Sequence, residues 1–539
     1  MKKGLKLFAC GFLAITAMAT HVNAEEVTDA SSLATCVAKT ENTCTLKNNV
    51  EVASAIEVGT NIVLDLNGYT LSANEESFAD DSLLVVLRKG TLTVQDSSAT
   101  KAGKIDGEND NLATTIKVTK YGENNDTDAA TLVVNGGTIA GKNLAISGNG
   151  NRHNTVITIN DGIVSSTNAT AIYHPQDGTI TVNGGTIEGE TGIEMRSGKL
   201  TVTGGTIRGT YQPVEVNANG SGTTTDGAGI AVAQHTTKKA IEVKVSGGTI
   251  EGHTALYESN PQKNEAAAIE KVSITVSGGT LNTINGGTNA IYSENDRITV
   301  EGGEFNAELP EDVTTSEGSE VYEVETEDGE TKYVVATDEE VVEEVYETEV
   351  LTKEEVEANL KEIEELLKEV AKEELEEEAQ AYYELLENFL ADVNEALKGK
   401  TIASSHDIFY GSFIDGNYVL ESDQRELNEA VEVTISIPES LEKVKEGYTR
   451  KYTVIRTHET IGEDGTLGYE IAELDAKDNG DGTVTFASDK FSTYILAYED
   501  VQNTTNPNTG DNILVYLVLS VISVAGLMFT GLKVAKKNN

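Results

Sequence analysis

Few residues of this chain have the type and spacing that acid–base chemistry requires. Removing a proton from a sugar needs a basic residue, and hydrolysing a glycosidic bond needs two carboxylates with different pKa values. Glu194 and Arg196 form the one neat acid–base pair, and as residues i and i+2 of a strand they would face the same way. The charges of neighbouring repeats (Glu188, Arg208 and Glu251) are scattered. We therefore interpret Glu194 and Arg196 as a solvated surface pair and expect no catalytic residue.

The histidines and acidic loops do not predict a metal or cofactor site. The histidines of the repeats, which are His153, His174, His235 and His253, fall in loops or near corners at unrelated positions. The runs Gly107–Leu112 and Gly122–Asp128 are rich in Asp and Asn but lack the nonapeptide pattern of calcium-binding β-rolls. We expect them to be solvated loops, and we expect no metal and no cofactor.

A column of tyrosines is the best candidate for ligand binding. A motif of a small, an aliphatic and a variable residue recurs at residues 171–173, 192–194, 229–231, 255–257 and 290–292. If these segments stack, the aliphatic residues form an inward ladder of Ile172, Ile193, Ile230, Leu256 and Ile291, and Tyr173, Tyr257 and Tyr292 share an outer column. Exposed tyrosines can stack on sugar rings or contact a partner protein. The simpler interpretation is that they cover neighbouring coils.

A repeated phrase must position these residues. Versions of it read LVVNGGTIAG at Leu132–Gly141, ITVNGGTIEG at Ile180–Gly189 and VKVSGGTIEG at Val243–Gly252. Alternating apolar residues predict short strands, and the glycine pair between them predicts a tight corner. Most corners recur at solenoid spacing, although the intervals Gly204–Gly247 and Gly247–Gly278 are longer. We expect loops there, or an extra coil with Val214–Val216 as its strand.

These repeats resemble the right-handed parallel β-helix of the pectate-lyase-like superfamily. The segments Asn61–Leu71 and Leu92–Asp96 also resemble the opening coils of secreted bacterial β-helix proteins. The resemblance is architectural and covers about half of the chain. It implies a solenoid over residues 51–307, and it carries no activity because one fold supports many functions.

The N-terminus predicts export. Residues 1–24 have the basic, apolar and small-residue regions of a signal peptide. Residues 25–50 would cap the solenoid, with a helix over Asp29–Ala38 that begins at Ser31 or Ser32. Cys36 and Cys44 could pair outside the cell or remain free. The formal net charge of -49 opposes binding to nucleic acid. The absence of Trp and an aromatic content of only 5% are unusual for an enzyme with an aromatic sugar cleft.

Beyond the repeats the chain changes character. Residues 308–336 are predicted to form a linker and a β-hairpin that turns at Asp328-Gly329. Residues 337–399 are predicted to form an acidic helical segment with capping boxes at Thr337/Glu340 and Thr352/Glu355, interrupted at Glu373–Glu378 and ended by Gly399. That segment could act as a spacer, pack against its neighbours or dimerise.

Residues 400–500 return to strands. The predicted strands are Val431–Ile437, Tyr448–Arg456, Gly468–Leu474, Thr483–Ala487 and Ser492–Tyr498. The segment Phe491–Tyr494 reads FSTY and resembles the end of a small β-sandwich that often precedes the wall anchor of Gram-positive surface proteins. The resemblance implies that this module is a stalk.

The C-terminus has the most specific pattern. Within the linker 501–512, the motif Asn506-Pro507-Asn508-Thr509-Gly510 precedes an apolar run at 513–532 and a basic tail at 533–539. A run of 20 mostly apolar residues can span a bilayer, and the trailing lysines would hold that end inside. The order resembles the LPxTG sorting signal, with Asn506 in place of Leu. The resemblance implies that a sortase cleaves between Thr509 and Gly510 and joins Thr509 to peptidoglycan.

Taken together, the sequence predicts a mainly β surface protein of a Gram-positive bacterium. Its order would be a β-helix, a long acidic helix, a small β-sandwich and a C-terminal transmembrane helix. The expected partners are sortase, peptidoglycan, the membrane before sorting, and an unknown glycan or protein ligand. We expect an adhesin that is not an enzyme. The alternatives are an extracellular polysaccharide lyase or hydrolase, which a buried cluster of charged groups on one sheet would favour, and a structural wall component.

Overall fold

The computed structural model describes residues 24–119, 128–311, 313–326, 328–369, 372, 377–441, 443–462 and 467–503. The fold is mainly β, as predicted. The chain divides into two compact units, residues 1–338 and 339–539, which we call unit 1 and unit 2. Each unit is described by itself.

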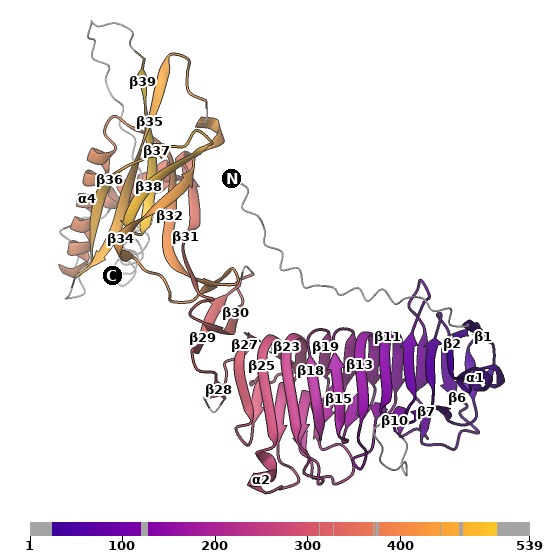
Figure 1. Cartoon of the computed structure of the whole chain (residues 1–539). Helices are drawn as coiled ribbons and strands as arrows, with labels where there is room; N and C mark the ends of the chain where they lie inside the picture. Colours follow the sequence, from indigo (N-terminus) through magenta and orange to yellow (C-terminus); the bar gives the residue numbers. More distant parts are fainter. Residues whose placement is uncertain are drawn as a thin grey trace, which may run out of the picture. The chain divides into compact units, whose positions relative to one another are not determined.

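Unit 1 is built from three parallel ladders of strands, and each repeat of the sequence contributes one segment to each ladder. Figure 1 shows the strands following one another in chain order from the α1 end to the β30 end. The first two ladders take their segments from β2 (Glu41–Leu46), β3 (Val50–Val52), β5 (Asn61–Asp65), β6 (Thr70–Ala73), β8 (Thr91–Gln95), β9 (Lys104–Gly107), β11 (Ala130–Gly141), β13 (Thr155–Ser166), β15 (Gly178–Val182), β16 (Thr186–Gly189), β18 (Gly198–Val202), β19 (Thr206–Gly209), β23 (Ile241–Gly252), β25 (Val272–Thr283) and β27 (Ile298–Phe305).

The third ladder is a separate nine-stranded sheet. In chain order its strands are β4 (Ile56–Val58), β7 (Ser82–Val86), β10 (Thr114–Val118), β12 (Leu144–Ser147), β14 (Ile172–His174), β17 (Ile193–Met195), β22 (Ala228–Ala233), β24 (Thr254–Ser259) and β26 (Ile291–Ser293). The predicted inward ladder is confirmed, because Ile172, Ile193, Ile230, Leu256 and Ile291 are register partners from strand to strand and all are fully buried.

The two glycines of each corner have different tasks. The second glycine takes a positive φ, which is +81° at Gly205. The first glycine lies against the preceding repeat, and a Cβ on Gly204 would lie 2.5 Å from the carbonyl oxygen of Asn183. Positive φ is costly for residues with a Cβ, and the close approach leaves no room for one. The second glycine is therefore required at each corner, whereas the first is required only where the repeats approach this closely, since Asp161 occupies that position in one corner and a Cβ on Gly136 would meet no atom closer than 3.6 Å.

The long interval between Gly204 and Gly247 does not contain an extra coil. Val202 pairs directly with Val245, and Ile207 pairs with Ile250, so β18 and β19 lie next to β23. The expectation that Val214–Val216 is the strand of an additional coil is wrong. Residues 210–227 instead leave the ladders and contain a short antiparallel pair, β20 (Glu215–Val216) and β21 (Thr225–Asp226). We call residues 210–227 the strap.

The N-terminal end of the ladders is covered by β1 (Ala24–Val27) and α1 (Ala30–Val37) (Figure 1). The predicted helix is present, but its N-cap is Asp29 and not Ser31 or Ser32. Asp29 accepts a hydrogen bond from the Ser32 amide, and Ser32 completes the capping box, so a short acidic side chain outcompetes the serines as the cap. Cys36 and Cys44 form a disulfide that ties α1 to β2.

The other end of unit 1 carries the predicted hairpin. A helical turn, α2 (Ala266–Ile269), precedes β25, and β28 (Thr314–Thr315) follows β27. Strands β29 (Ser319–Glu325) and β30 (Thr331–Thr337) form the hairpin, with Gly329 at a φ of +77° in its turn. Because β30 also pairs with β27, the hairpin is attached to the last repeat and is not a free linker.

Unit 2 has a main antiparallel sheet between two covering layers. The main sheet contains β31 (Val342–Thr352), β32 (Thr401–Ile414), β33 (Asn417–Val419), β35 (Tyr448–Ile461), β36 (Leu467–Asp475) and β39 (Ser492–Gln502). A small sheet of β34 (Glu426–Ser436), β37 (Lys477–Asp478) and β38 (Thr483–Lys490) packs on one face, together with a 3-10 turn, η2 (Glu439–Leu441). Each predicted strand of residues 400–500 is present, although β32 was not predicted.

The prediction of an acidic helical segment was only partly correct. Residues 342–352, expected to be helical after a capping box at Thr337/Glu340, form β31 because they pair with β32 across ten register positions. The capping box at Thr352/Glu355 is confirmed, with the Thr352 amide donating to Glu355 at 2.9 Å, and α3 (Lys353–Glu369) begins there. Gly399, at a φ of +82°, follows α4 (Glu377–Ala396) as predicted.

The two helices pack within their own unit. Val356 and Ile363 of α3, together with Leu386 and Phe389 of α4, are buried against Ile455 and other residues of the main sheet. Of the three options for the helical segment, packing against neighbouring elements is therefore the observed one. The helical segment and the predicted sandwich form one unit. The interruption expected at Glu373–Glu378 falls largely outside the described residues.

Several predicted segments lie outside the described residues. These are the signal peptide up to residue 23, the acidic run at 122–127, the sorting motif Asn506–Gly510, the apolar run at 513–532 and the tail at 533–539. Among the residues that are described, no helix is long and apolar enough to cross a membrane.

Candidate functional site

The third ladder of unit 1 carries the predicted tyrosine column on its outer face. Tyr173 pairs with Glu194, Glu194 with Ala231, Ala231 with Tyr257, and Tyr257 with Tyr292. We call these five positions the outer column. The predicted alignment of the three tyrosines is therefore confirmed. Their surroundings nevertheless differ sharply between the two ends of the column.

Tyr257 and Tyr292 form the open end of the outer column. Their rings are stacked, with centroids 4.6 Å apart and planes 17° apart. Tyr292 is 37% exposed, and Tyr257 is half-buried. Burial, with a smaller contribution from Tyr292, raises the pKa of Tyr257 to about 12, so the Tyr257 phenol stays protonated at neutral pH. The open end thus offers an aromatic surface with hydroxyl groups to the solvent.

Tyr173, Glu194 and Arg196 form the closed end of the outer column, where all three are buried and the strap is bound to Glu194 and Arg196. Tyr173 is only 5% exposed, and both Glu194 and Arg196 are fully buried. The interpretation of Glu194 and Arg196 as a solvated surface pair is therefore wrong. The two residues do face the same way, as their spacing predicted, but the face they share is covered by residues inserted between β19 and β22.

The Glu194 carboxylate is bound to the strap. The amide of Thr224 donates to both carboxylate oxygens, at 2.9 and 3.0 Å, and the Thr224 hydroxyl donates to Oε1 at 2.7 Å. Burial raises the pKa of Glu194 to about 7, against the opposing effects of the Arg196 charge and the Thr224 hydrogen bonds. Glu194 therefore titrates near neutral pH inside a closed polar site.

Arg196 holds the other side of the strap. Its Nη1 donates to the carbonyl oxygens of Asn219, at 2.8 Å, and of Gly222, while Nε donates to the carbonyl oxygen of Ala233 at 3.1 Å. Nε also lies 3.8 Å from the Glu194 carboxylate. A buried guanidinium cannot lose its charge, so the nearby carboxylate and the carbonyl oxygens compensate it.

Two polar atoms of the closed end have no hydrogen-bond partner among the described residues. They are the Tyr173 hydroxyl and Nη2 of Arg196. Burial raises the pKa of Tyr173 to about 12, and the charge of Arg196 and a weak hydrogen bond with it partly oppose this rise, so the two groups lie next to one another without a hydrogen bond of normal geometry. Buried polar groups normally have a partner, which makes this pair the least satisfied part of the site.

Of the predicted histidines, His235 lies beside the closed end, because its amide donates to the Arg196 carbonyl oxygen at 2.9 Å, and burial and the Arg196 charge lower its pKa. His174 is fully buried in β14, and its Nδ1 donates to the Ser197 carbonyl oxygen at 3.0 Å. Burial lowers the pKa of His174 to about 4, so it stays neutral. His153 lies 3.7 Å from Asp177 in a loop. Within the described part of the chain, no three His, Cys, Asp or Glu side chains are placed to hold a metal ion.

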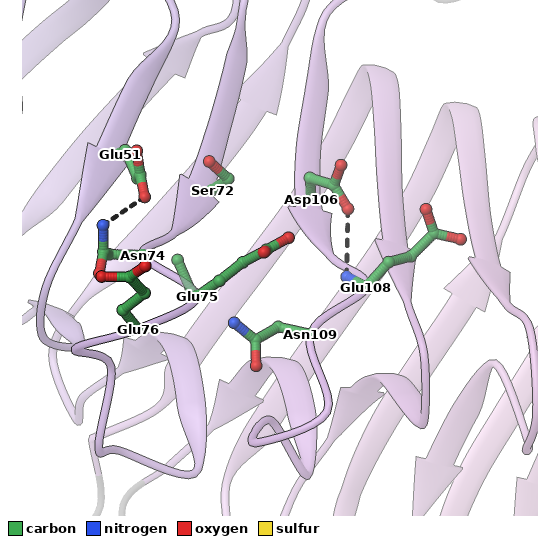
Figure 2. A pocket seen from close by; sticks show the side chains of 9 residues that line it. Glu51, Ser72, Asn74, Glu75, Glu76, Asp106, Glu108 and Asn109 are labelled. Atoms are coloured by element: carbon green, nitrogen blue, oxygen red, sulfur yellow. Dashed lines mark hydrogen bonds between the residues drawn. The ribbon is translucent and has the colours of Figure 1, made fainter.

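An acidic pocket of about 460 Å³ lies elsewhere in unit 1. It includes two residues of the Gly107–Leu112 run, and its lining residues are Glu51, Ser72, Ala73, Asn74, Glu75, Glu76, Asp106, Glu108 and Asn109. Figure 2 shows Glu51 directed at Asn74 on one side and Asp106 beside the backbone of Glu108 on the other. Lys104 and Thr167 bind Glu108 and lower its pKa. Part of the negative charge that lines the pocket is therefore compensated by neighbouring groups of the protein.

Unit 2 contains an arrangement that resembles a catalytic relay and that the sequence did not reveal. The Ser404 hydroxyl lies 2.8 Å from Nε2 of His406, whose Nδ1 lies 2.6 Å from Glu347. These distances suit a nucleophile, a base and an orienting acid. However, Ser404 is only 1% exposed whereas the Glu347 side chain is 38% exposed. The nucleophile is thus the buried member, and no substrate can reach it in this conformation.

The residues that sequence reasoning missed at the closed end are those of the strap. Asn219, Gly222 and Thr224 bind Glu194 and Arg196 although they lie more than 20 residues away along the chain. The one available signal was the long interval between Gly204 and Gly247, which predicted an insertion but not the face that it covers.

Comparison of the chain with protein-family models, with curated proteins and with solved structures finds no match in any of the three.

Proposed function

We propose that this chain is an exported protein of a Gram-positive cell surface that displays a ligand-binding domain and is not an enzyme. In this proposal unit 1 is a right-handed parallel β-helix, and unit 2 is a stalk that ends in the sorting signal at Asn506–Gly510. The observation that carries the binding function is the stacked pair Tyr257 and Tyr292, which lies on an outer sheet face with Tyr292 exposed.

The arrangement of charges supports binding over catalysis. Glu194 and Arg196 are buried and bonded to the strap, and Glu258, beside the open end, is also buried and bonded to Ser293 and Asn295. Catalytic acids and bases must reach their substrate. Aromatic rings with exposed faces and hydroxyl groups suit the recognition of a glycan or a protein.

Binding is tested with the full-length protein on an array of glycans and matrix proteins. We expect Tyr292→Ala and Tyr257→Ala each to weaken binding at least about tenfold, because aromatic anchors dominate contact energies. Tyr322→Ala is the matched control, since Tyr322 is a partly exposed tyrosine of the β29–β30 hairpin in the same unit. Binding that is unchanged by both column variants would contradict the proposal.

Anchoring is tested separately in cells. The wall fraction of cells that lack sortase should lose the protein to the membrane or the medium, and Thr509→Ala should have the same effect. An unchanged amount of protein in the wall fraction after either change would contradict anchoring by sortase. This experiment does not depend on the ligand.

The second candidate function is an extracellular enzyme acting on a polysaccharide. The observation that favours it is the closed end itself, where a carboxyl group with a pKa near 7 lies 3.8 Å from a guanidinium group beside the unpartnered hydroxyl of Tyr173. Turnover of an acidic polysaccharide that is lost in Glu194→Gln would favour the enzyme. Turnover that persists in Glu194→Gln would place the chemistry elsewhere.

A further inference from the structure

The strap covers one end of the outer column and leaves the other end exposed. The column runs without interruption from Tyr173 through Glu194, Ala231 and Tyr257 to Tyr292. At about 4.8 Å per strand, Tyr173 and Tyr257 are about 14 Å apart. A ligand extended along the column would therefore meet the closed end directly after the open one.

The closed end has the polar groups of a binding site that is only partly used. Tyr173 and Arg196 are both more than nine-tenths buried and interact with one another, but the Tyr173 hydroxyl and the Arg196 Nη2 make no hydrogen bond of normal geometry among the described residues. Nη2 can only donate hydrogen bonds, whereas a phenol can donate and accept. A hydroxyl group of a ligand could accept from Arg196 and donate to Tyr173, so the chemistry matches a hydroxyl-rich molecule.

The two ends of the strap are fixed to the ladders, and its middle is held by fewer contacts. At the ends, the amides of Thr210 and Gly227 donate to the carbonyl oxygens of Gly189 and Glu190, Asn285 donates to the Thr210 carbonyl oxygen, and Thr191 donates to the Thr225 carbonyl oxygen at 2.7 Å. In the middle, besides Glu194 and Arg196, Gln262 donates to the Asn219 carbonyl oxygen at 2.6 Å and His235 hydrogen-bonds the Gly220 backbone. Its own secondary structure is a pair of two-residue strands, and residues 215–221 are exposed. A two-stranded hairpin has little stability of its own.

We propose that the strap conceals a second glycan subsite, formed by Tyr173, Glu194 and Arg196, which opens to extend the binding surface of Tyr257 and Tyr292. The ligand is an oligosaccharide long enough to span both ends of the outer column. The aromatic pair binds its first sugars, and the polar groups of the closed end bind the hydroxyl groups that follow. This inference rests on the proposed binding function for its ligand class, but its residues are different.

The test uses the full-length protein and a library of neutral and acidic oligosaccharides, from disaccharides to octasaccharides. Thr224→Val removes the hydroxyl that donates to Glu194, which should raise the open population of the strap and the affinity for long oligosaccharides about three- to tenfold. Disaccharides should bind with unchanged affinity. Adding Tyr173→Phe to Thr224→Val should remove the gain.

Controls separate strap opening from a general loss of structure. Thr223→Val makes the same chemical change one residue earlier, where the side chain is partly exposed, and should have no effect. Gln262→Ala loosens the strap from its outer side without changing the closed end and should raise the affinity as Thr224→Val does. Hydrogen exchange of the amides of residues 210–227 should be faster in both loosened variants.

The outcomes are distinguishable. If long oligosaccharides bind, Tyr292→Ala abolishes binding, and neither loosened variant changes the affinity, the second subsite is wrong while the proposed function stands. If only the loosened variants bind oligosaccharides and Tyr292→Ala has no effect, the subsite is supported and the role of the open end is wrong. If no variant binds any member of the library, the subsite is also overturned.

Discussion

The two ends of the outer column have the same backbone but opposite surroundings. At the open end, Tyr257 and Tyr292 stack on one another with Tyr292 in contact with solvent. At the closed end, Tyr173 occupies the equivalent position on β14 and is buried, as are Glu194 and Arg196, to which the strap is bound. The ladder pairing is parallel and in register at both ends. The difference therefore arises from an insertion in one coil and not from the strands themselves.

This contrast shows how a regular stack acquires a specialised region. The strands repeat the same inward aliphatic column along the whole ladder, so their outward positions are free to vary. An insertion between two strands can cover such positions and convert a surface charge pair into a buried one. The strap then supplies hydrogen bonds that compensate Glu194 and Arg196 for the hydration they lose on burial.

The largest expected effect is the loss of the buried carboxylate at the closed end. At pH 8, Glu194→Ala leaves the Arg196 charge without its partner and should lower the free energy of unfolding of unit 1 by about 3–5 kcal/mol. Glu294→Ala at the open end is the control, since Glu294 is exposed and should cost less than about 1 kcal/mol. Urea denaturation measures both. Equal losses of unfolding free energy in the two variants would show that the two ends do not differ in stability.

Replacing a corner glycine with alanine should lower the free energy of unfolding by the same amount at both ends. Gly205 and Gly279 have φ values of +81° and +88°, and a Cβ on either would lie 2.8 Å from the backbone of the preceding repeat. We expect a loss of about 2–3 kcal/mol in each case. Gly286→Ala tests the φ effect alone, because nothing lies within 4 Å of its Cβ, and should cost about 1 kcal/mol. Differential scanning calorimetry checks the three variants.

The closed end should make the stability of unit 1 depend on pH. Because the pKa of Glu194 is raised to about 7 in the folded state, its protonated form is favoured there, and its contribution to stability declines as the pH rises from about 4.5 to about 7. Relative to Glu194→Gln, the wild type should lose about 1–2 kcal/mol over this range, since one pKa unit corresponds to about 1.4 kcal/mol and relaxation of the site relieves part of the shift.

Comparing the wild type with Glu194→Gln cancels the contributions of other titrating groups near the site. Burial lowers the pKa of His174 to about 4 and raises the pKa values of Glu190 and Asp226, and these effects are common to both proteins. Urea denaturation at a series of pH values gives the two stability curves. Parallel curves would mean that Glu194 titrates at its ordinary value.

The smallest expected effect comes from single hydroxyl groups. Tyr173→Phe removes a buried hydroxyl without a hydrogen-bond partner and should leave unit 1 unchanged or stabilise it by up to about 1 kcal/mol. Tyr292→Phe removes an exposed hydroxyl and should have no measurable effect. Thermal unfolding of both variants checks this. A loss above about 1 kcal/mol in Tyr173→Phe would show that the hydroxyl is satisfied in solution.

Much of the fold could be predicted because its signals are local. Alternation and glycine pairs identified the strands and corners, the aliphatic triplets identified the inward ladder, and Asp328-Gly329 identified the hairpin turn. The prediction failed at residues 342–352, where a Glu-rich sequence suggested a helix. There the pairing of β31 with β32 outweighs the local preference. The same limit applies to Ser404 and His406, whose partner Glu347 lies on that unpredicted strand.

The sequence by itself determined the register of the stack and which residues share a face, because a period of two and a glycine corner leave one consistent alignment. It placed Tyr173, Tyr257 and Tyr292 in one column and directed Glu194 and Arg196 to one side of a strand. Only the tertiary structure decided which of these positions is exposed, because burial depends on contacts with residues distant in the chain. Thr224 and Asn219 of the strap bind Glu194 and Arg196 and so keep them from solvent. No pattern in the repeats specifies which face of the ladder an insertion covers.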